Sequence, residues 1–216
     1  MAGDAGFRRG ASGAGQLEPR RLRLALHAVF PHHGRMTRLI RRLLFGFVLL
    51  ANLAAAEPAE IADLRRDAET GDISAQTKLG ALYVVGDGVP QDYALAVKWL
   101  RKSADEGDAT AQFLLAGMYV EGKGVPKDAS EAVKWYRKAA EQGDDGAQLS
   151  LGVCYVTGDG VGKDLAQGFA WFSISDTNGN EKAREFLATL EKEMTAEQVA
   201  EGTKIARKLF KRLPRK

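Results

Sequence analysis

The feature that most constrains the fold of this chain is an internal period of 36 residues. Four columns of residues recur at this spacing: Gly71, Gly107, Gly143 and Gly179; Ala75, Ala111, Ala147 and Ala183; Tyr83, Tyr119 and Tyr155; Trp99, Trp135 and Trp171. Repeats of this length are supersecondary units that bury their hydrophobic faces against their neighbours. The sequence therefore predicts a stack of similar units.

Each unit is predicted to contain two helices joined by a Gly-x-Gly turn. The first helix follows a residue that can cap a helix N-terminus: Asp72, Asp108, Asp144 and Asn180. The second helix follows a residue of the same kind: Asp92, Asp128 and Asp164. Apolar residues recur at helical spacing between these caps, and no strand pattern of comparable length is present. The expected fold class is all-α, an α/α solenoid of about three full 36-residue repeats with helical caps at both ends.

Both ends of the array are predicted to carry capping helices. Residues 57–70 align with the second helix of a repeat and are expected to cap the front, and residues 71–194 hold the repeats. Glu191 stands where the tyrosine of the period belongs, so the array stops there. Thr195 and Gln198 have the spacing of a capping box. Residues 195–216 are therefore predicted to form a basic C-terminal capping helix.

The residues before the array have the composition of an export signal. Residues 36–56 combine a basic segment, an apolar run from Leu43 and small residues up to Ala56, which are the three parts of a secretory signal peptide. We expect cleavage after Ala56 and a periplasmic or secreted protein. A retained transmembrane anchor is the alternative, for which this run is short. Residues 1–35 are interpreted as a mis-annotated start, with translation beginning at Met36, or as a disordered arm.

Charge and histidine content exclude several function classes for the remainder of the chain. Residues 1–56 hold nine Arg and two acidic residues, whereas residues 57–216 hold 22 Lys or Arg and 26 Asp or Glu. The basic balance thus belongs to the N-terminal segment, and no nucleic-acid partner is predicted. All three His lie before residue 57, which rules out His-based triads and zinc sites after it. No serine there has the Ser-x-x-Lys spacing of a serine β-lactamase. We predict no catalytic residue, no metal and no cofactor.

The period also assigns the unusual apolar residues. Cys154 occupies the column of Leu82 and Met118 and is expected to be a buried, reduced thiol, with an interchain disulfide as the alternative. The tryptophans recur beside alanines and are expected to form core ladders, although such rings can also stack on sugars.

Several of these columns together resemble the Sel1-like repeat (SLR) family, a relative of the tetratricopeptide repeat. The resemblance spans about residues 60–195 and rests on Ala75-Gln76, Leu79-Gly80, Tyr83, Gly86-x-Gly88-Val89, Asp92, Ala96, Trp99, Ala104 and Gly107. It implies a right-handed superhelix and a non-catalytic scaffold or adaptor that binds a partner protein or peptide, often in bacterial envelope or signalling assemblies. Some family members have been linked to penicillin binding and hydrolysis. A cell-wall-directed (β-lactam or peptidoglycan) hydrolase or a glycan-binding protein is therefore the alternative, with carboxylates such as Glu121 or Asp145 as candidates.

A partner-binding groove is predicted from the positions that differ between repeats. On a helical wheel of the first helix, the unchanging columns fill one arc and are expected to stack, while the variable columns fill the opposite arc. The arc also contains Thr77 and Gly146, and the predicted groove residues are Ser74, Lys78, Ala81, Val85, Thr110, Phe113, Leu114, Gly117, Glu121, Leu149, Ser150, Val153 and Thr157. Exposed apolar side chains in its centre would favour a partner segment. The alternative is that Phe113 and Leu149 pack between repeats.

The C-terminal helix is a second candidate surface. Residues 195–216 hold seven basic and two acidic residues, and the basic side chains proposed for electrostatic docking are Lys204, Lys208, Lys211 and Arg212. A peripheral contact with an anionic membrane surface is one interpretation. The simpler one is a capping helix with a solvated basic face.

Overall fold

The computed structural model describes residues 58–214, which form helices joined by short turns. The helices of this part are α3 (Ala59–Glu69), α4 (Ile73–Val85), α5 (Tyr93–Asp105), α6 (Ala109–Glu121), α7 (Ala129–Glu141), α8 (Asp145–Thr157), α9 (Leu165–Thr177), α10 (Glu181–Leu190) and α11 (Ala196–Phe210). None of them is both long enough and apolar enough to cross a membrane. The predicted arm at 1–35 and signal peptide at 36–56 lie outside the described residues.

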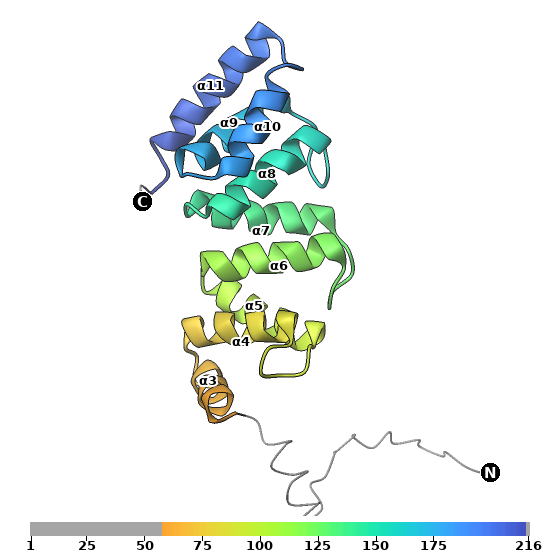
Figure 1. Cartoon of the computed structure of the whole chain (residues 1–216), viewed down its shortest axis with the longest axis vertical. Coiled ribbons are helices and arrows are strands. Elements are labelled where there is room, and N and C mark those ends of the chain that lie inside the picture. Colours follow the sequence, from red (N-terminus) through yellow and green to blue (C-terminus); the bar gives the residue numbers. More distant parts are fainter. Residues whose placement is uncertain (1–57, 215–216) are drawn as a thin grey trace, which may run out of the picture. The chain divides into compact units, whose positions relative to one another are not determined.

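The helices pack in pairs that follow one another along the chain. Helices α4 and α5, α6 and α7, and α8 and α9 form hairpins, and each hairpin contacts the next. Figure 1 shows these pairs stacked in sequence order, with α3 before the first pair and α10 and α11 after the last. The prediction of an all-α repeat fold is confirmed.

The predicted caps explain where the helices begin. Asp72 Oδ1 accepts a hydrogen bond of 2.6 Å from the backbone N–H of Ala75, and Asp108 and Asp144 repeat this contact one and two periods later. The turns between paired helices pack closely on the preceding repeat. Gly124 and Gly160 have positive φ, and a Cβ at either position would overlap a backbone carbonyl oxygen of the repeat before it.

The repeated apolar columns form the core. The three tryptophans are 3–5% exposed, as the period predicts, and Leu79, Leu115 and Leu151 are fully buried. A Cβ at Gly80 would lie 2.7 Å from Leu100 Cγ, and one at Gly152 would lie 2.5 Å from Phe172 Cδ1. Small residues are therefore needed in this column, because paired helices approach closely there.

Polar contacts also recur between successive repeats. Gln76, Gln112 and Gln148 each donate from Nε2 to the carbonyl oxygen of an alanine eight residues earlier, at 3.0–3.2 Å. Arg137 donates from Nη2 to the hydroxyl of Tyr155 at 2.9 Å, and Arg101 makes the same bond to Tyr119. These bonds join the second helix of one repeat to the first helix of the next.

The last helix departs from the pairing of the others. Helix α11 begins with the predicted capping box of Thr195 and Gln198, but it packs against α9 and not as the hairpin partner of α10. Helix α9 is therefore covered on several sides, by α8, α10 and α11. Its Ala170 and Ile174 are 0% and 2% exposed, although one period earlier the same positions are the exposed Lys134 and Lys138. These apolar residues extend the apolar surface of α9 beyond the face that packs on α8, as expected for a helix that other helices cover on several sides.

Candidate partner-binding surfaces

Eleven of the predicted groove residues lie on one exposed stripe across α4, α6 and α8. We call this the repeat stripe; it consists of Ser74, Lys78, Ala81 and Val85, then Thr110, Leu114, Gly117 and Glu121, then Ser150, Val153 and Thr157. The positions within each helix are separated by four, three and four residues, which is one face of a helix. All of these residues are exposed or half-buried, and Val85 reaches 72% exposure.

Phe113, Leu149 and Thr77 do not belong to this stripe, because they pack between helices. The ring of Phe113 lies 5.8 Å from that of Tyr136 and against Gly146 of the next repeat. Leu149 packs on the cluster around Phe169 and Phe172. Thr77 is buried, and its hydroxyl lies 2.5 Å from that of Ser103. This column thus packs mainly between the two helices of its own repeat, and Phe113 also reaches the next repeat at Gly146.

The centre of the repeat stripe is marked by Gly117. A Cβ at Gly80 or Gly152 would strike a neighbouring side chain, whereas a Cβ at Gly117 would meet nothing within 4 Å. Glycine inside a helix costs about 1 kcal/mol relative to alanine. Packing within the described residues therefore gives no reason for this glycine.

A hydrogen bond joins Tyr136 on the second helix of this repeat to Ser150 on the first helix of the next. Tyr136 is 8% exposed, and burial raises the pKa of its hydroxyl, while a hydrogen bond with Ser150 opposes that rise. Ser150 itself is half-buried on the stripe. Glu121 ends the α6 part of the stripe and forms an ion pair of 2.5 Å with Lys123. The stripe therefore combines apolar, small and hydrogen-bonding groups.

The tryptophans do not offer open faces for a sugar. Lys98 and Lys102 lie over the ring of Trp99, with Nζ 5.4 and 4.6 Å from its centroid, and Lys138 lies over Trp135 at 3.8 Å. The lysine side chains on the outer face of α5 and α7 thus cover the tryptophan rings of the core.

Two further features bear on reactivity and metal binding among the described residues, namely the single thiol and the placement of potential metal ligands. Cys154 is buried, as predicted, and burial raises the pKa of its thiol, so it is a poor nucleophile. Residues 58–214 contain no cluster of three His, Cys, Asp or Glu side chains that could hold a metal ion.

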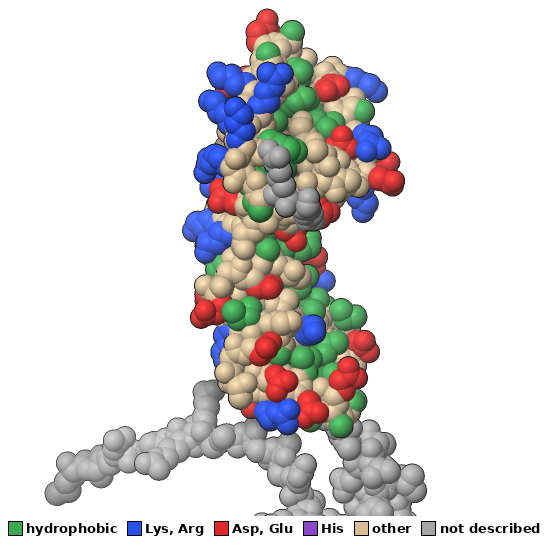
Figure 2. Space-filling model, turned by 90° about the vertical axis from the view of Figure 1, so that its left-hand side faces the viewer, with side chains coloured by type: hydrophobic (Ala, Val, Ile, Leu, Met, Phe, Trp, Pro, Cys, Tyr) green, Lys and Arg blue, Asp and Glu red, His purple; other side chains and the backbone are tan. Residues whose placement is uncertain are grey.

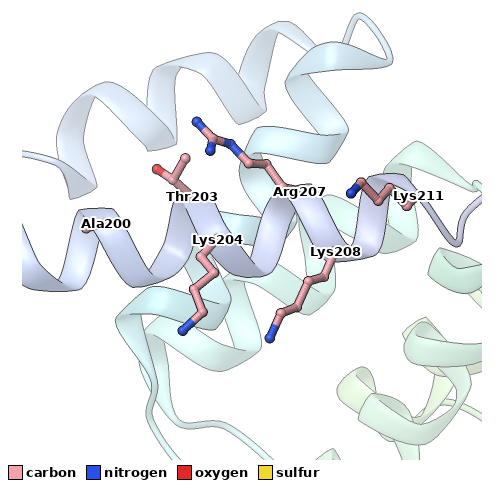
Figure 3. A pocket seen from close by; sticks show the side chains of 6 residues that line it. All are labelled: Ala200, Thr203, Lys204, Arg207, Lys208 and Lys211. Atoms are coloured by element: carbon pink, nitrogen blue, oxygen red, sulfur yellow. The ribbon is translucent and has the colours of Figure 1, made fainter.

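The basic residues of α11 form the second surface. Lysine and arginine side chains gather along one edge near the end of the molecule that carries α11 (Figure 2). Lys204, Lys208, Lys211 and Arg212 are all exposed, and Lys204 pairs with Glu201 at 3.1 Å. Arg207, which the sequence reasoning did not select, lines the same shallow hollow as Lys204, Lys208 and Lys211 (Figure 3). Its helical spacing from Lys204 and Lys211 was the signal that could have found it.

Comparison with known sequences identifies the repeats. The Sel1 repeat pattern matches residues 73–108, 109–144 and 146–175, which are the three hairpins of the structure. The chain belongs to the Sel1-repeat family. As a Sel1-repeat protein it is a helical repeat scaffold, in agreement with the resemblance found in the sequence.

Solved structures of Sel1-repeat proteins are similar to this chain. A Sel1 repeat protein from Oxalobacter formigenes is 39% identical, with a TM-score of 0.56 over 61% of this chain and 99% of its own. A protective antigen of uropathogenic Escherichia coli with an SLR fold is also 39% identical, with a TM-score of 0.67 over 71% of this chain. The chain spans only 33% of that antigen's length. No curated protein sequence matches the chain.

Proposed function

We propose that this Sel1-repeat protein is an exported, non-catalytic adaptor that binds a segment of a partner protein across the repeat stripe. The export signal at 36–56 would deliver it, after cleavage at Ala56, to the periplasm or the exterior. The partner would be a peptide or an extended loop, because the stripe crosses the first helices of three successive repeats and each of these helices offers only a few side chains to a partner.

The observation that carries this proposal is the open space at Gly117. A helix interior that keeps glycine without a packing reason leaves its backbone accessible, so that another chain can approach closely. The same stripe holds Leu114 and Val153, which are half-buried and also pack against the hydrophobic core, and the half-buried hydroxyl of Ser150. A glycine among apolar and hydrogen-bonding side chains leaves room for the backbone of an extended segment, whose alternate side chains could contact these neighbours.

The proposal is tested by filling the space. Gly117→Gln adds a side chain where nothing lies within 4 Å, so we expect the fold to be retained while the partner is excluded. Ala94→Gln on the exposed side of α5 is the matched control. A photo-crosslinker at Ser150 identifies the captured protein in intact cells, and one at Lys134 on α7, the second helix of the preceding repeat, reports on contacts elsewhere.

The expected result is a protein captured from position 150 and not from 134, whose capture is reduced by Gly117→Gln and retained in Ala94→Gln. Undiminished capture in Gly117→Gln, with an unchanged melting temperature, would contradict the stripe as the binding surface. Turnover of a β-lactam or of peptidoglycan fragments by purified residues 57–216 would contradict the non-catalytic part of the proposal.

A further inference from the structure

The pattern of polar and apolar residues on α11 is inverted relative to the second helices of the repeats. Gly202 of α11 packs against Phe169 and Ala166 of α9, and Ala166 lies 36 residues earlier, so we compare α11 with the second helices at the spacing of the repeats. Counted in this register, Arg207 stands in the tryptophan column and Lys208 stands in the column of the buried Tyr136 and Phe172. Conversely, Ala206 and Phe210 stand where α7 has Lys134 and Lys138.

This inversion turns the face that other repeats use for stacking into a basic surface. Lys204, Arg207, Lys208 and Lys211 fall within an arc of about 100° on the helix and extend over about 10 Å of it, and Arg212 follows in the turn directly after α11. We call this set the α11 basic face. Arg207, Lys208, Lys211 and Arg212 make no ion pair with an acid among residues 58–214, and only Lys204 is paired. Their charges are available to a partner.

The shape of the face indicates which anionic partner it suits. In Figure 3, Lys204 and Lys208 point the same way from α11 and Arg207 leaves its opposite edge, and the hollow between them is lined by α11 alone. Within residues 58–214, no second helix closes this hollow around an individual acidic side chain. A broad sheet of negative charges can contact several of these diverging cations at once.

Two further features agree with a lipid surface. Phe210 borders the face beside Arg207 and Lys211 and is 40% exposed, although it is a large apolar side chain. Aromatic rings next to cations suit the boundary between headgroups and acyl chains. The apolar run Leu43–Ala56 is predicted to bring the chain to a membrane, whether it is cleaved or retained.

We propose that the α11 basic face docks the protein on the surface of an anionic lipid bilayer. Residues 57–194 hold 15 basic and 24 acidic residues, so the rest of the unit is repelled by such a surface and the molecule is oriented with α11 towards it. The repeat stripe belongs to other helices, and this docking is independent of the adaptor function proposed above.

The test measures co-sedimentation with vesicles of phosphatidylcholine, with and without phosphatidylglycerol. Residues 57–216 form a compact unit of their own and are used beside the full chain. The test variant is Arg207→Gln/Lys208→Gln/Lys211→Gln, and the control Lys127→Gln/Lys163→Gln/Lys182→Gln removes three exposed charges elsewhere. Circular dichroism and melting temperatures check that both variants are folded.

Binding is expected only to vesicles with phosphatidylglycerol, and about 0.5 M salt is expected to abolish it because exposed charges are then screened within a few ångströms. The test variant should bind about 100-fold more weakly, at about fivefold per charge near the surface, and the control should bind like the wild type. Equal binding to neutral vesicles, equal loss in both variants or no binding by the wild-type unit would overturn the proposal. Binding to polyglutamate or DNA in the absence of vesicle binding would overturn it as well.

Discussion

Gly202 of α11 lies so close to Phe169 of α9 that a Cβ at position 202 would stand 2.7 Å from the ring carbon Cδ1. The same Cβ would stand 3.0 Å from the carbonyl oxygen of Ala166. This contact lets α11 cover α9, and it explains why α9 carries Ala170 and Ile174 in columns where the earlier second helices carry lysine. Helix α11 is thus held by α9 of the third repeat and not by α10, the helix that precedes it in the chain.

A larger side chain at this contact is expected to displace α11. Gly202→Leu would overpack the α9–α11 interface, and overpacking typically costs about 1–3 kcal/mol. We expect a lower urea midpoint and binding of a hydrophobic dye to the uncovered Ile174 and Phe210. Gly117→Leu is the control, because its Cβ has open space. Equal midpoints for Gly202→Leu and the wild type would show that α11 does not depend on this approach.

The repeats were predictable because the sequence contains three copies of each structural position, 36 residues apart. The capping residues, the glycine at the end of each first helix and the buried tryptophans follow from residues that agree at one spacing. The position of α11 was not predictable in this way, because its columns are inverted and match no other copy. The apolar residues Ala170 and Ile174, in columns that carry lysine elsewhere, were the available signal that another helix covers α9.

One buried amide lacks the partner that its equivalents have. Gln142 donates to Gln112 Oε1 at 2.8 Å, and Asn178 donates to Gln148 Oε1 at 2.9 Å, each from 30 residues later. The equivalent position for Gln76 is Glu106, a carboxylate that cannot donate when ionised, and Gln76 Oε1 is buried without a hydrogen-bond partner. The first repeat is therefore missing one bond of this series.

Restoring the donor is expected to stabilise the protein. Glu106→Gln should raise the free energy of unfolding by about 1 kcal/mol, the usual net contribution of a hydrogen bond to a buried acceptor. Gln142→Glu is the matched reverse exchange and should lower it by a similar amount, because Gln112 then loses its donor. Chemical denaturation at neutral pH measures both. A decrease in stability for Glu106→Gln would contradict this explanation.

The candidate surface was only partly predictable, since a helical wheel does not show which neighbour a side chain meets. The columns of Ser74, Lys78, Ala81 and Val85 were correctly placed on the exposed side of α4. The column of Phe113 lies at the margin of this arc, where the second helix of the same repeat approaches, and its members pack inward. The distance from Gly117 to any neighbour is a tertiary property that no single helix reveals.

The helix glycines are expected to respond in opposite directions to the same substitution. Gly117→Ala should raise the free energy of unfolding by up to about 1 kcal/mol, because alanine favours the helix and its methyl group meets nothing. Gly152→Ala should lower it, because the Cβ would lie 2.5 Å from Phe172. Thermal unfolding of both variants checks the prediction. Destabilisation by Gly117→Ala would mean that this position is packed against something in solution.

The buried thiol of Cys154 is expected to be protected in the folded protein. Because burial raises the pKa of this thiol, the folded state holds less thiolate than the unfolded state at any pH near 8. Reaction with Ellman's reagent should therefore be slow in buffer and fast in urea.

The same shift makes stability fall at alkaline pH. Unfolded chains lose the thiol proton first, so the free energy of unfolding should decrease as pH rises past the ordinary thiol pKa, until the folded state also ionises. Cys154→Met, which places the residue of the second repeat in the third, removes this titration while Tyr136 titrates in both proteins. The difference in stability between wild type and Cys154→Met should shift towards the variant between about pH 7 and pH 10. A difference that is independent of pH would show that the thiol is accessible to solvent in the folded state.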